Sequence, residues 1–425
     1  MHKKGYVVKK VILISILFLS NAINAVQIRA QATKHAAMPM LLVGYKVAPA
    51  DGAMHYILKT IQKDLSFTKQ FQPDLKMERS LQWERWQAYP ITVLIQRKNE
   101  RAFIWQVYDG TRGKIIADGT ITQQTSDRAY AHALADAVWK ALTGSDGFFS
   151  TRIAYCKEQL HEGALAKHLF VADYDGNNEE LLVDDPAVII APRWNHGNAR
   201  PLVFYSEFTD TNVRMMYTDL HGNKRAACDF EGTSMLPTFA QDGSKIVFCA
   251  SNGSGATQLY TIVEGKARKL TNNSGNNFCP SLTQDGSSVY FCSDCGLGQP
   301  SIFVYNLTTK KLDRIAQTAG SESPTYCSVN KRLAYCKNVK GVMQLFVYDT
   351  ARDTHRQLTD DAGSKQSVSW SPCGNYLLYA RYDTQGKTGL CMMHAGTKRT
   401  YPLATSGGNV SYPHWSPRYE RYPVA

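Results

Sequence analysis

Cysteines are the residues in this sequence whose spacing most directly suggests chemistry. All ten lie at or after Cys156. Cys292 and Cys295 have the Cys-x-x-Cys spacing of redox and zinc sites, but no second pair stands at a spacing that would complete a zinc site. We therefore interpret most of the cysteines as small, buried, apolar residues and expect no metal or cofactor. The sequence leaves the disulfide pattern open.

Carboxylates and histidines give a second set of candidates. The segment Asp173–Asn177 (Asp-Tyr-Asp-Gly-Asn) resembles a calcium loop, but its glycine comes too early for an EF-hand, so a turn is favoured. His55 and His132 fall on predicted helices without a partner at ligand spacing, and we interpret them as solvated or capping side chains. His161 and His168 lack the spacing of a zincin.

A repeated sequence step predicts the secondary-structure elements that carry most of these cysteines, carboxylates and histidines. A small-Pro-x-aromatic step recurs at intervals of 45, 43, 44, 44 and 45 residues. Its six copies are Ala191–Trp194, Leu236–Phe239, Cys279–Leu282, Ser323–Tyr326, Ser367–Trp370 (without the proline) and Tyr412–Trp415. A period of roughly 40–50 residues is typical of propellers or solenoids.

Short strand patterns inside each repeat favour the propeller. Four strands follow one another with no helix between them, and Asp-Gly turns such as Asp242-Gly243 join the first two. The first unit begins with a second strand at 151–156, and the chain ends with a first strand at 412–419. Joining these two pieces predicts a sixth blade, made from both ends of an all-β six-bladed propeller.

The chain before the repeats predicts a signal segment and a small domain. Residues 1–25 combine a basic start, a ten-residue apolar core and small residues up to Ala25, so we expect export and removal of this segment by cleavage after Ala25, with Ala22 as the alternative. Residues 26–147 are expected to form a two-layer α/β domain, and residues 148–425 the propeller. No later stretch is apolar enough to insert into a membrane.

Within the small domain the expected order is β-α-(α)-β-β-β-α. Asp51 is a predicted N-cap, and Ser126 and Gly144 are the predicted start and stop of the last helix. The remaining expected elements are a strand at 40–45, helices at 53–65 and 80–87, a strand at 91–96 and a hairpin of 102–108 with 114–123.

The net charge of the chain indicates which classes of binding partner are expected. The formal charge is +12, of which Lys3, Lys4, Lys9 and Lys10 in the signal segment contribute four, which leaves 12 − 4 = +8. This excess is spread along the chain without a Lys/Arg run, so no nucleic-acid partner is expected. A basic surface favours an acidic protein or an anionic envelope polymer.

Two function classes follow from the propeller. Apolar residues before the prolines favour a binding protein with a docking patch at the channel mouth. The alternative is a periplasmic hydrolase or lyase, but no Gly-x-Ser-x-Gly nucleophile motif occurs, and mainly Glu322 and His414 could act near the mouth. We expect no catalytic residues.

The junction at 142–155, the Trp-Ser-Pro steps at Trp370 and Trp415, and the Asp-Gly turns resemble the TolB family of the Tol-Pal system. The resemblance covers nearly the whole chain. It implies a non-enzymatic, monomeric periplasmic protein that supports outer-membrane integrity and envelope invagination at cell division. Its implied partner at the propeller mouth is the peptidoglycan-associated lipoprotein Pal.

The resemblance also implies partner-binding residues. The expected contacts of a Pal-like lipoprotein are Thr233, Ser234, Met235, Leu236, Asn277, Phe278, Cys279, Glu322, Gln366 and Tyr412, with Ile190 beside them. The family's mature N-terminus binds TolA as an added strand, and the matching residues are Val26, Gln27, Ile28 and Arg29. After Arg29 the sequence departs from the family's apolar alternation, which weakens the expectation of a TolA-like partner.

Overall fold

The computed structural model describes residues 37–48, 50–80, 88–161, 164–185, 187–197, 200–253, 255–295 and 298–419. The predicted signal segment 1–25, the TolA-like strand 26–29 and nearly all of the helix predicted at 80–87 lie outside the described residues.

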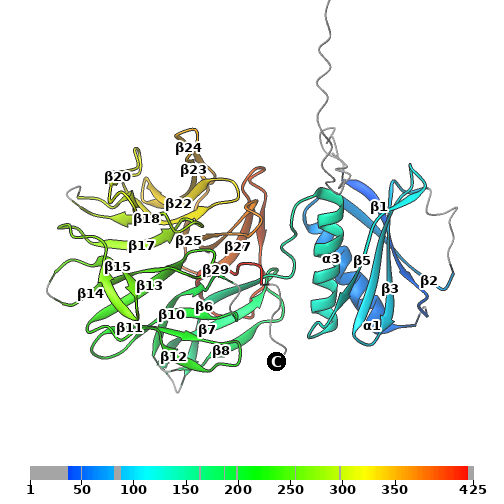
Figure 1. Cartoon of the computed structure of the whole chain (residues 1–425), viewed down its shortest axis with the longest axis horizontal. Coiled ribbons are helices and arrows are strands. Elements are labelled where there is room, and N and C mark those ends of the chain that lie inside the picture. The colour runs from blue at the N-terminus through cyan, green and yellow to red at the C-terminus, as the bar shows by residue number, and fades with distance from the viewer. Residues whose placement is uncertain are drawn as a thin grey trace, which may run out of the picture.

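A two-layer α/β domain precedes the propeller (Figure 1). Its sheet has the strand order β2-β1-β3-β4-β5, with β1 parallel to β2 and β3 and antiparallel pairing from β3 to β5. Helices α1 and α3 share one apolar core with one face of this sheet. The elements are β1 (Met38–Tyr45), α1 (Gly52–Phe67), β2 (Phe71–Glu78), β3 (Ile91–Asn99), β4 (Ala102–Asp109), β5 (Lys114–Thr122) and α3 (Asp127–Thr143).

Both helices begin at their predicted caps and α3 ends at its predicted glycine, whereas α1 ends at Phe67, two residues beyond its predicted end. Asp51 accepts a hydrogen bond from the amide of Met54 at 2.9 Å, and Ser126 accepts one from Ala129 at 3.1 Å. Gly144 ends α3 in the left-handed conformation with φ 72°. Strand β2 is absent from the predicted order. Its sequence contains Pro73 and several charged residues, which do not resemble a strand pattern, and such a strand is tolerated only at the edge of a sheet, where β2 lies.

The rest of the chain is a ring of six four-stranded antiparallel blades, as predicted (Figure 1). Blade 1 is β9 (Val188–Trp194), β10 (Val203–Phe208), β11 (Val213–Thr218) and β12 (Lys224–Ala226). Blade 2 is β13 (Thr233–Phe239), β14 (Ile246–Ser251), β15 (Gln258–Val263) and β16 (Lys266–Lys269). Blade 3 is β17 (Asn277–Leu282), β18 (Ser288–Ser293), β19 (Ser301–Asn306) and β20 (Leu312–Arg314).

The remaining blades complete the ring. Blade 4 is β21 (Ser321–Cys327), β22 (Arg332–Val339), β23 (Val342–Asp349) and β24 (Thr354–Gln357). Blade 5 is β25 (Ser364–Trp370), β26 (Tyr376–Tyr382), β27 (Thr388–His394) and β28 (Thr400–Pro402). The closing blade joins β29 (Val410–Trp415) to β6 (Arg152–His161), β7 (Ala164–Asp173) and β8 (Glu180–Val183).

Ring closure joins the two ends of the propeller in one sheet. Strand β29 pairs antiparallel with β6, and it also contacts the innermost strands on either side, β25 and β9. The indole Nε1 of Trp415 donates to Oγ1 of Thr151 at 2.7 Å, and the amide of Arg152 donates to Oγ of Ser416 at 3.0 Å. The predicted construction of the sixth blade from both ends is confirmed.

Aromatic rings join the α/β domain to the propeller at this same closure. Phe67 of α1 lies 4.4 Å from Tyr401, measured between ring centroids. Phe148, between the domains, lies 4.9 Å from Tyr376 of blade 5 and 5.8 Å from Trp415 of the closing blade. The apolar core is therefore continuous from α1 into blade 5 and the closing blade.

Candidate functional site

Each innermost strand of the propeller carries a β-bulge at the repeated step. The residue before the proline, or before Val368 in blade 5, has a positive φ in all six strands. These residues are Ala191 (53°), Leu236 (56°), Cys279 (50°), Ser323 (51°), Ser367 (54°) and Tyr412 (53°). Pairing with the second strand skips at the same place in every blade. None of the six is glycine, so each costs roughly 1 kcal/mol of backbone strain.

The expected Pal contacts all lie at or before these bulges. Thr233, Ser234, Met235 and Leu236 belong to β13, Asn277, Phe278 and Cys279 to β17, and Glu322, Gln366 and Tyr412 to β21, β25 and β29. Strands β13, β17, β21, β25 and β29 contact one another in this order around the ring, and Ile190 on β9 follows β29. The structure thus brings the expected residues to one level of the channel, before the bulge.

Two of these residues turn away from the channel. Asn277 is fully buried and its Nδ2 donates to Oε1 of Gln258 at 3.0 Å and to Oγ1 of Thr271 at 3.1 Å. Ser234 is also buried, and its Oγ accepts from the amide of Met215 at 3.2 Å. Their side chains serve packing within and between blades. The half-buried residues that remain, including Met235, Leu236 and Phe278, form the accessible part of the predicted surface.

Burial sets the protonation of the ionisable groups near the mouth. It raises the pKa of the Glu322 carboxyl, and it raises the pKa values of the Cys279 thiol and the Tyr412 phenol. The mouth therefore combines apolar side chains with groups that are held toward their neutral forms.

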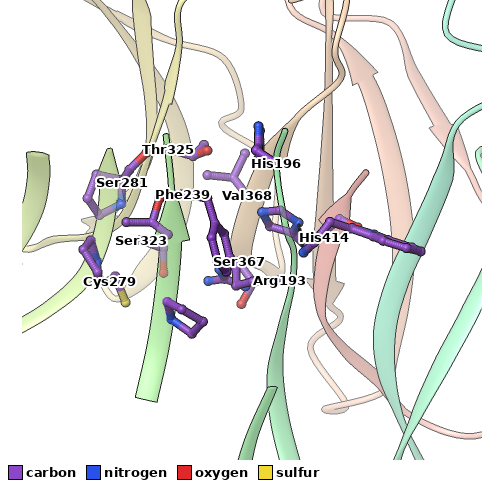
Figure 2. A pocket seen from close by; sticks show the side chains of 15 residues that line it. Arg193, His196, Phe239, Cys279, Ser281, Ser323, Thr325, Ser367, Val368 and His414 are labelled. Carbon is purple, nitrogen blue, oxygen red and sulfur yellow. Dashed lines mark hydrogen bonds between the residues drawn. The ribbon is translucent and has the colours of Figure 1, made fainter. Parts of the chain in front are cut away.

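At and beyond the bulges lies a cavity of about 50 Å³ in the channel, lined by residues of all six innermost strands (Figure 2). Arg193 from blade 1, Cys279 from blade 3, Ser323 from blade 4 and Ser367 from blade 5 surround the same space. His414 of the closing blade also lines this space, and its Nδ1 accepts from the amide of Trp194 at 3.3 Å. Sequence reasoning missed Arg193 as a functional candidate, although it occupies the x position of the repeated step.

The four cysteines at equivalent repeat positions are buried, as predicted. Cys156, Cys249, Cys292 and Cys336 are at most 4% exposed, and all ten cysteines of the chain are free. Burial raises the pKa of Cys156 to about 12, although the amide of Ala191 on the next blade hydrogen-bonds its sulfur. These thiols pack under the bulge of the neighbouring strand. Within the described ranges, no group of three or more His, Cys, Asp or Glu could hold a metal ion.

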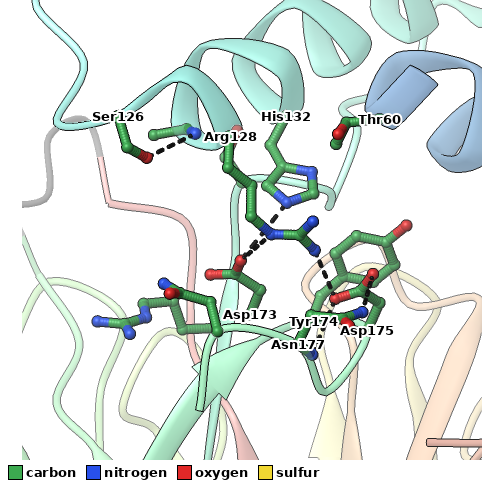
Figure 3. A network of polar contacts seen from close by, with 12 residues as sticks. Thr60, Ser126, Arg128, His132, Asp173, Tyr174, Asp175 and Asn177 are labelled. Carbon is green, nitrogen blue, oxygen red and sulfur yellow. Dashed lines mark hydrogen bonds and ion pairs between the residues drawn. The ribbon is translucent and has the colours of Figure 1, made fainter. Parts of the chain in front are cut away.

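The predicted turn at 173–177 is confirmed, and it lies against the α/β domain (Figure 3). Arg128 of α3 binds the carboxylates of Asp173 and Asp175, and Lys63 of α1 lies 2.8 Å from Asp175. Burial opposes ionisation of Asp175, but Lys63 and Arg128 outweigh it and lower its pKa to about 2. These carboxylates bind the basic side chains of the neighbouring domain.

His132 corrects one interpretation from the sequence. It was expected to be solvated or to cap a helix, but it is buried between the two domains. Its Nδ1 lies 2.7 Å from Asp64. Its Nε2 faces Asp173 at 3.6 Å (Figure 3). The partners lie 68 and 41 residues away in the chain, so the local spacing of helix residues could not reveal them. His55, in contrast, is exposed on α1.

Two helices, α1 and α3, occur among the described residues. Neither α1 nor α3 has the length and apolar character that crossing a bilayer requires.

These features define a class of protein: a six-bladed propeller with an N-terminal α/β domain, an apolar mouth and a narrow channel. The family model of the TolB beta propeller domain matches residues 139–419, more than half of the chain. The chain therefore belongs to the TolB family.

Relatives of known name agree with this assignment. The Tol-Pal system protein TolB of Roseobacter denitrificans is 28% identical over 215 residues, which are 46% of this chain and 48% of that protein. The protein of the same name from Rickettsia bellii is 33% identical over 129 residues, 30% of this chain and 29% of that protein. The chain thus spans about half the length of these relatives, or less.

A solved structure has the same architecture. The crystal structure of TolB from Acinetobacter baumannii aligns with a TM-score of 0.76 and 24% identity, covering 90% of this chain and 98% of that one. The likeness extends to both domains because it covers nearly all of each chain, and at this identity it supports the fold.

Proposed function

We propose that this chain is a non-enzymatic interaction protein of the Tol-Pal system that binds a Pal-like lipoprotein at the propeller mouth. The observation that carries the proposal is the placement of Met235, Leu236 and Phe278. These large apolar side chains are half-buried on two adjacent innermost strands. Met235 and Leu236 pack partly against the apolar core of blades 2 and 3, and all three side chains keep part of their surface exposed. Methionine and aromatic side chains in such a position are enriched at protein interfaces.

The bulges support this placement physically. Positive φ at Leu236 and Cys279 fixes the direction of the strand directly after Met235 and Phe278. A rigid backbone limits the conformational entropy that is lost when a partner binds. Sites of retained backbone strain are often functional, because folding stability alone does not favour them.

The wider role follows from the family. We propose a monomeric periplasmic protein with a signal segment at 1–25, an α/β domain at 26–147 and the propeller at 148–425. It would support outer-membrane integrity and envelope invagination during cell division. A TolA-like inner-membrane protein is a second proposed partner, through Val26, Gln27, Ile28 and Arg29, by addition of a strand.

A pull-down of the exported protein from cell envelopes tests the mouth. Phe278→Asp and Met235→Asp should each weaken capture of a Pal-like lipoprotein at least tenfold, because a buried unpaired carboxylate in an interface costs more than about 1.4 kcal/mol. Val329→Asp is the matched control, since Val329 is 66% exposed in the turn after β21, at the opposite end of the channel.

The proposed site is wrong if the control and the two mouth variants capture the lipoprotein equally well. Turnover of peptide or glycan substrates by the purified protein would contradict the non-enzymatic role.

A further inference from the structure

The channel holds a positive charge for which the described part of the chain provides no counter-ion. Arg193 forms no ion pair with any described residue, and its one hydrogen bond to a described residue goes from Nη1 to the carbonyl of the adjacent Pro192, at 2.8 Å. The side chain is only partly accessible to water. A guanidinium has five N–H donors, so most of those of Arg193, which lines the cavity, have no acceptor among the described residues.

The wall of the cavity has the composition of an anion site. Its 15 lining residues include Arg193, two histidines and five Ser or Thr hydroxyls, but no Asp or Glu. A cation surrounded by groups that can donate hydrogen bonds attracts negative charge, because the low dielectric of a protein wall strengthens the interaction.

Several lining hydroxyls have their acceptor role filled and their proton available. Oγ of Ser281 accepts from the amide of Tyr326 at 2.8 Å, and Oγ1 of Thr238 accepts from Leu282 at 3.1 Å. Since a hydroxyl carries one proton in addition to its lone pairs, each can still donate into the cavity. His414 accepts at Nδ1, so its neutral ring carries the proton on Nε2.

Neighbouring groups do not neutralise Arg193. Burial keeps His196 neutral by lowering its pKa to about 4, and burial together with the charge of Arg193 lowers the pKa of His414 well below its ordinary value. Glu322 lies at the mouth, outside the residues that line the cavity, and burial holds its carboxyl toward the neutral form. Burying an unpaired guanidinium is costly, and a bound anion would remove that cost.

We propose that the propeller channel binds a small oxyanion or free carboxylate, held by the planar fork of Arg193 and by the surrounding hydroxyls. Oxygen anions are the expected class because a guanidinium matches two oxygens at once. The site lies at and beyond the bulges, and Cys279 is the one lining residue that it shares with the lipoprotein surface proposed at the mouth.

Thermal unfolding of the full-length protein tests the site. Inorganic phosphate replaces chloride at constant ionic strength and pH 7, and it should raise the Tm of the wild type by about 2–4 °C. Acetate in a parallel titration tests a planar carboxylate. A response to either probe supports the site, and a response to neither overturns it.

Variants then locate the response. Arg193→Gln should abolish the Tm shift, whereas Arg268→Gln, which removes the same charge from the exposed strand β16, should retain it. An equal shift in both variants would assign the effect to general ion binding and overturn the proposal.

A second measurement covers the case in which Arg193→Gln does not fold. Anomalous scattering from crystals of the wild type soaked in bromide should place an anion beside Arg193. Bromide sites confined to the outer surface would contradict the proposal.

Discussion

Single residues tie the two domains together through buried charge, and His132 is the clearest case. Its imidazole is 4% exposed and lies between Asp64 from α1 and Asp173 from the propeller. The phenol of Tyr174 donates to the other oxygen of Asp64 at 2.9 Å. Burial opposes a charged imidazole, but the two carboxylates outweigh it and raise the pKa of His132 to about 10. The imidazolium is therefore part of the folded structure at neutral pH.

Replacement of His132 should be strongly destabilising. His132→Gln leaves the buried carboxylate of Asp64 without its cation, which costs about 3–5 kcal/mol. Urea unfolding of this variant, with the exposed His55→Gln as the control, measures the difference. Equal midpoints for both variants would show that the buried pair adds nothing.

The same residue predicts a pH dependence of stability. The folded pKa of about 10 lies above the ordinary value of 6.5, so the contribution of His132 is complete below pH 6.5 and declines as the pH rises toward 10. The difference in urea midpoint between wild type and His132→Gln should therefore shrink from pH 6.5 to pH 10. A difference that stays constant over this range would mean that His132 is neutral in the folded protein.

Among the helices and strands, the sequence pattern predicted correctly those features that depend on residues close together in the chain. The caps at Ser126 and Gly144 lie where expected, and so do the six blades, because helix ends, turns and repeats are encoded by neighbouring residues. Strand β2 was missed because its partner β1 lies 33 residues earlier and its own sequence contains Pro73. Strand β2 forms only because it pairs with β1, and this distant pairing is not visible in the sequence of β2 itself.

The candidate site was predictable only in outline. Its strands and their level in the channel followed from the repeat and from the family resemblance. The orientation of the Asn277 side chain away from the channel did not, because it depends on Gln258 and Thr271 of the preceding blade. The bulges were equally hidden, since residues as different as Ala191, Leu236 and Tyr412 adopt the same left-handed backbone. In five of the six blades the bulge residue is followed by a proline, which removes one backbone donor from the strand pairing.

Bulge strain predicts an unusual response to glycine. Ala191 is buried at a φ of 53°, which glycine adopts without strain, so Ala191→Gly should leave the stability unchanged or raise it by about 0.5–1 kcal/mol. Ala334→Gly on strand β22 removes the same buried methyl group at an ordinary φ, and it should cost about 1 kcal/mol. Thermal unfolding compares the two. A loss of equal size in both variants would show that the bulge holds no strain.

Across the whole molecule, the α/β domain covers the place where the propeller closes. Phe148 contacts blade 5 and the closing blade together, and the Asp136 carboxylate accepts from the amides of Phe149 and Ser150 at 2.9 and 3.0 Å. A Cβ on Gly147 would lie 2.1 Å from Asp136, so the junction has no room for another side chain. Domain docking and ring closure therefore depend on one shared core.

This arrangement predicts that loss of the last strand unfolds the ring. Deletion of 412–425 removes most of β29, opens the edge of β6 and removes the contacts of β29 with β9 and β25, so it should abolish cooperative unfolding of the propeller. Trp415→Ala disturbs the same closing strand without deleting it. Trp415 is 2% exposed and hydrogen-bonded to Thr151, so its loss should cost about 3–5 kcal/mol, whereas Trp105→Ala on the half-buried face of β4 should cost less. Calorimetry of the three variants measures these effects. A truncated chain that unfolds at the wild-type temperature would show that closure by β29 does not hold the ring together.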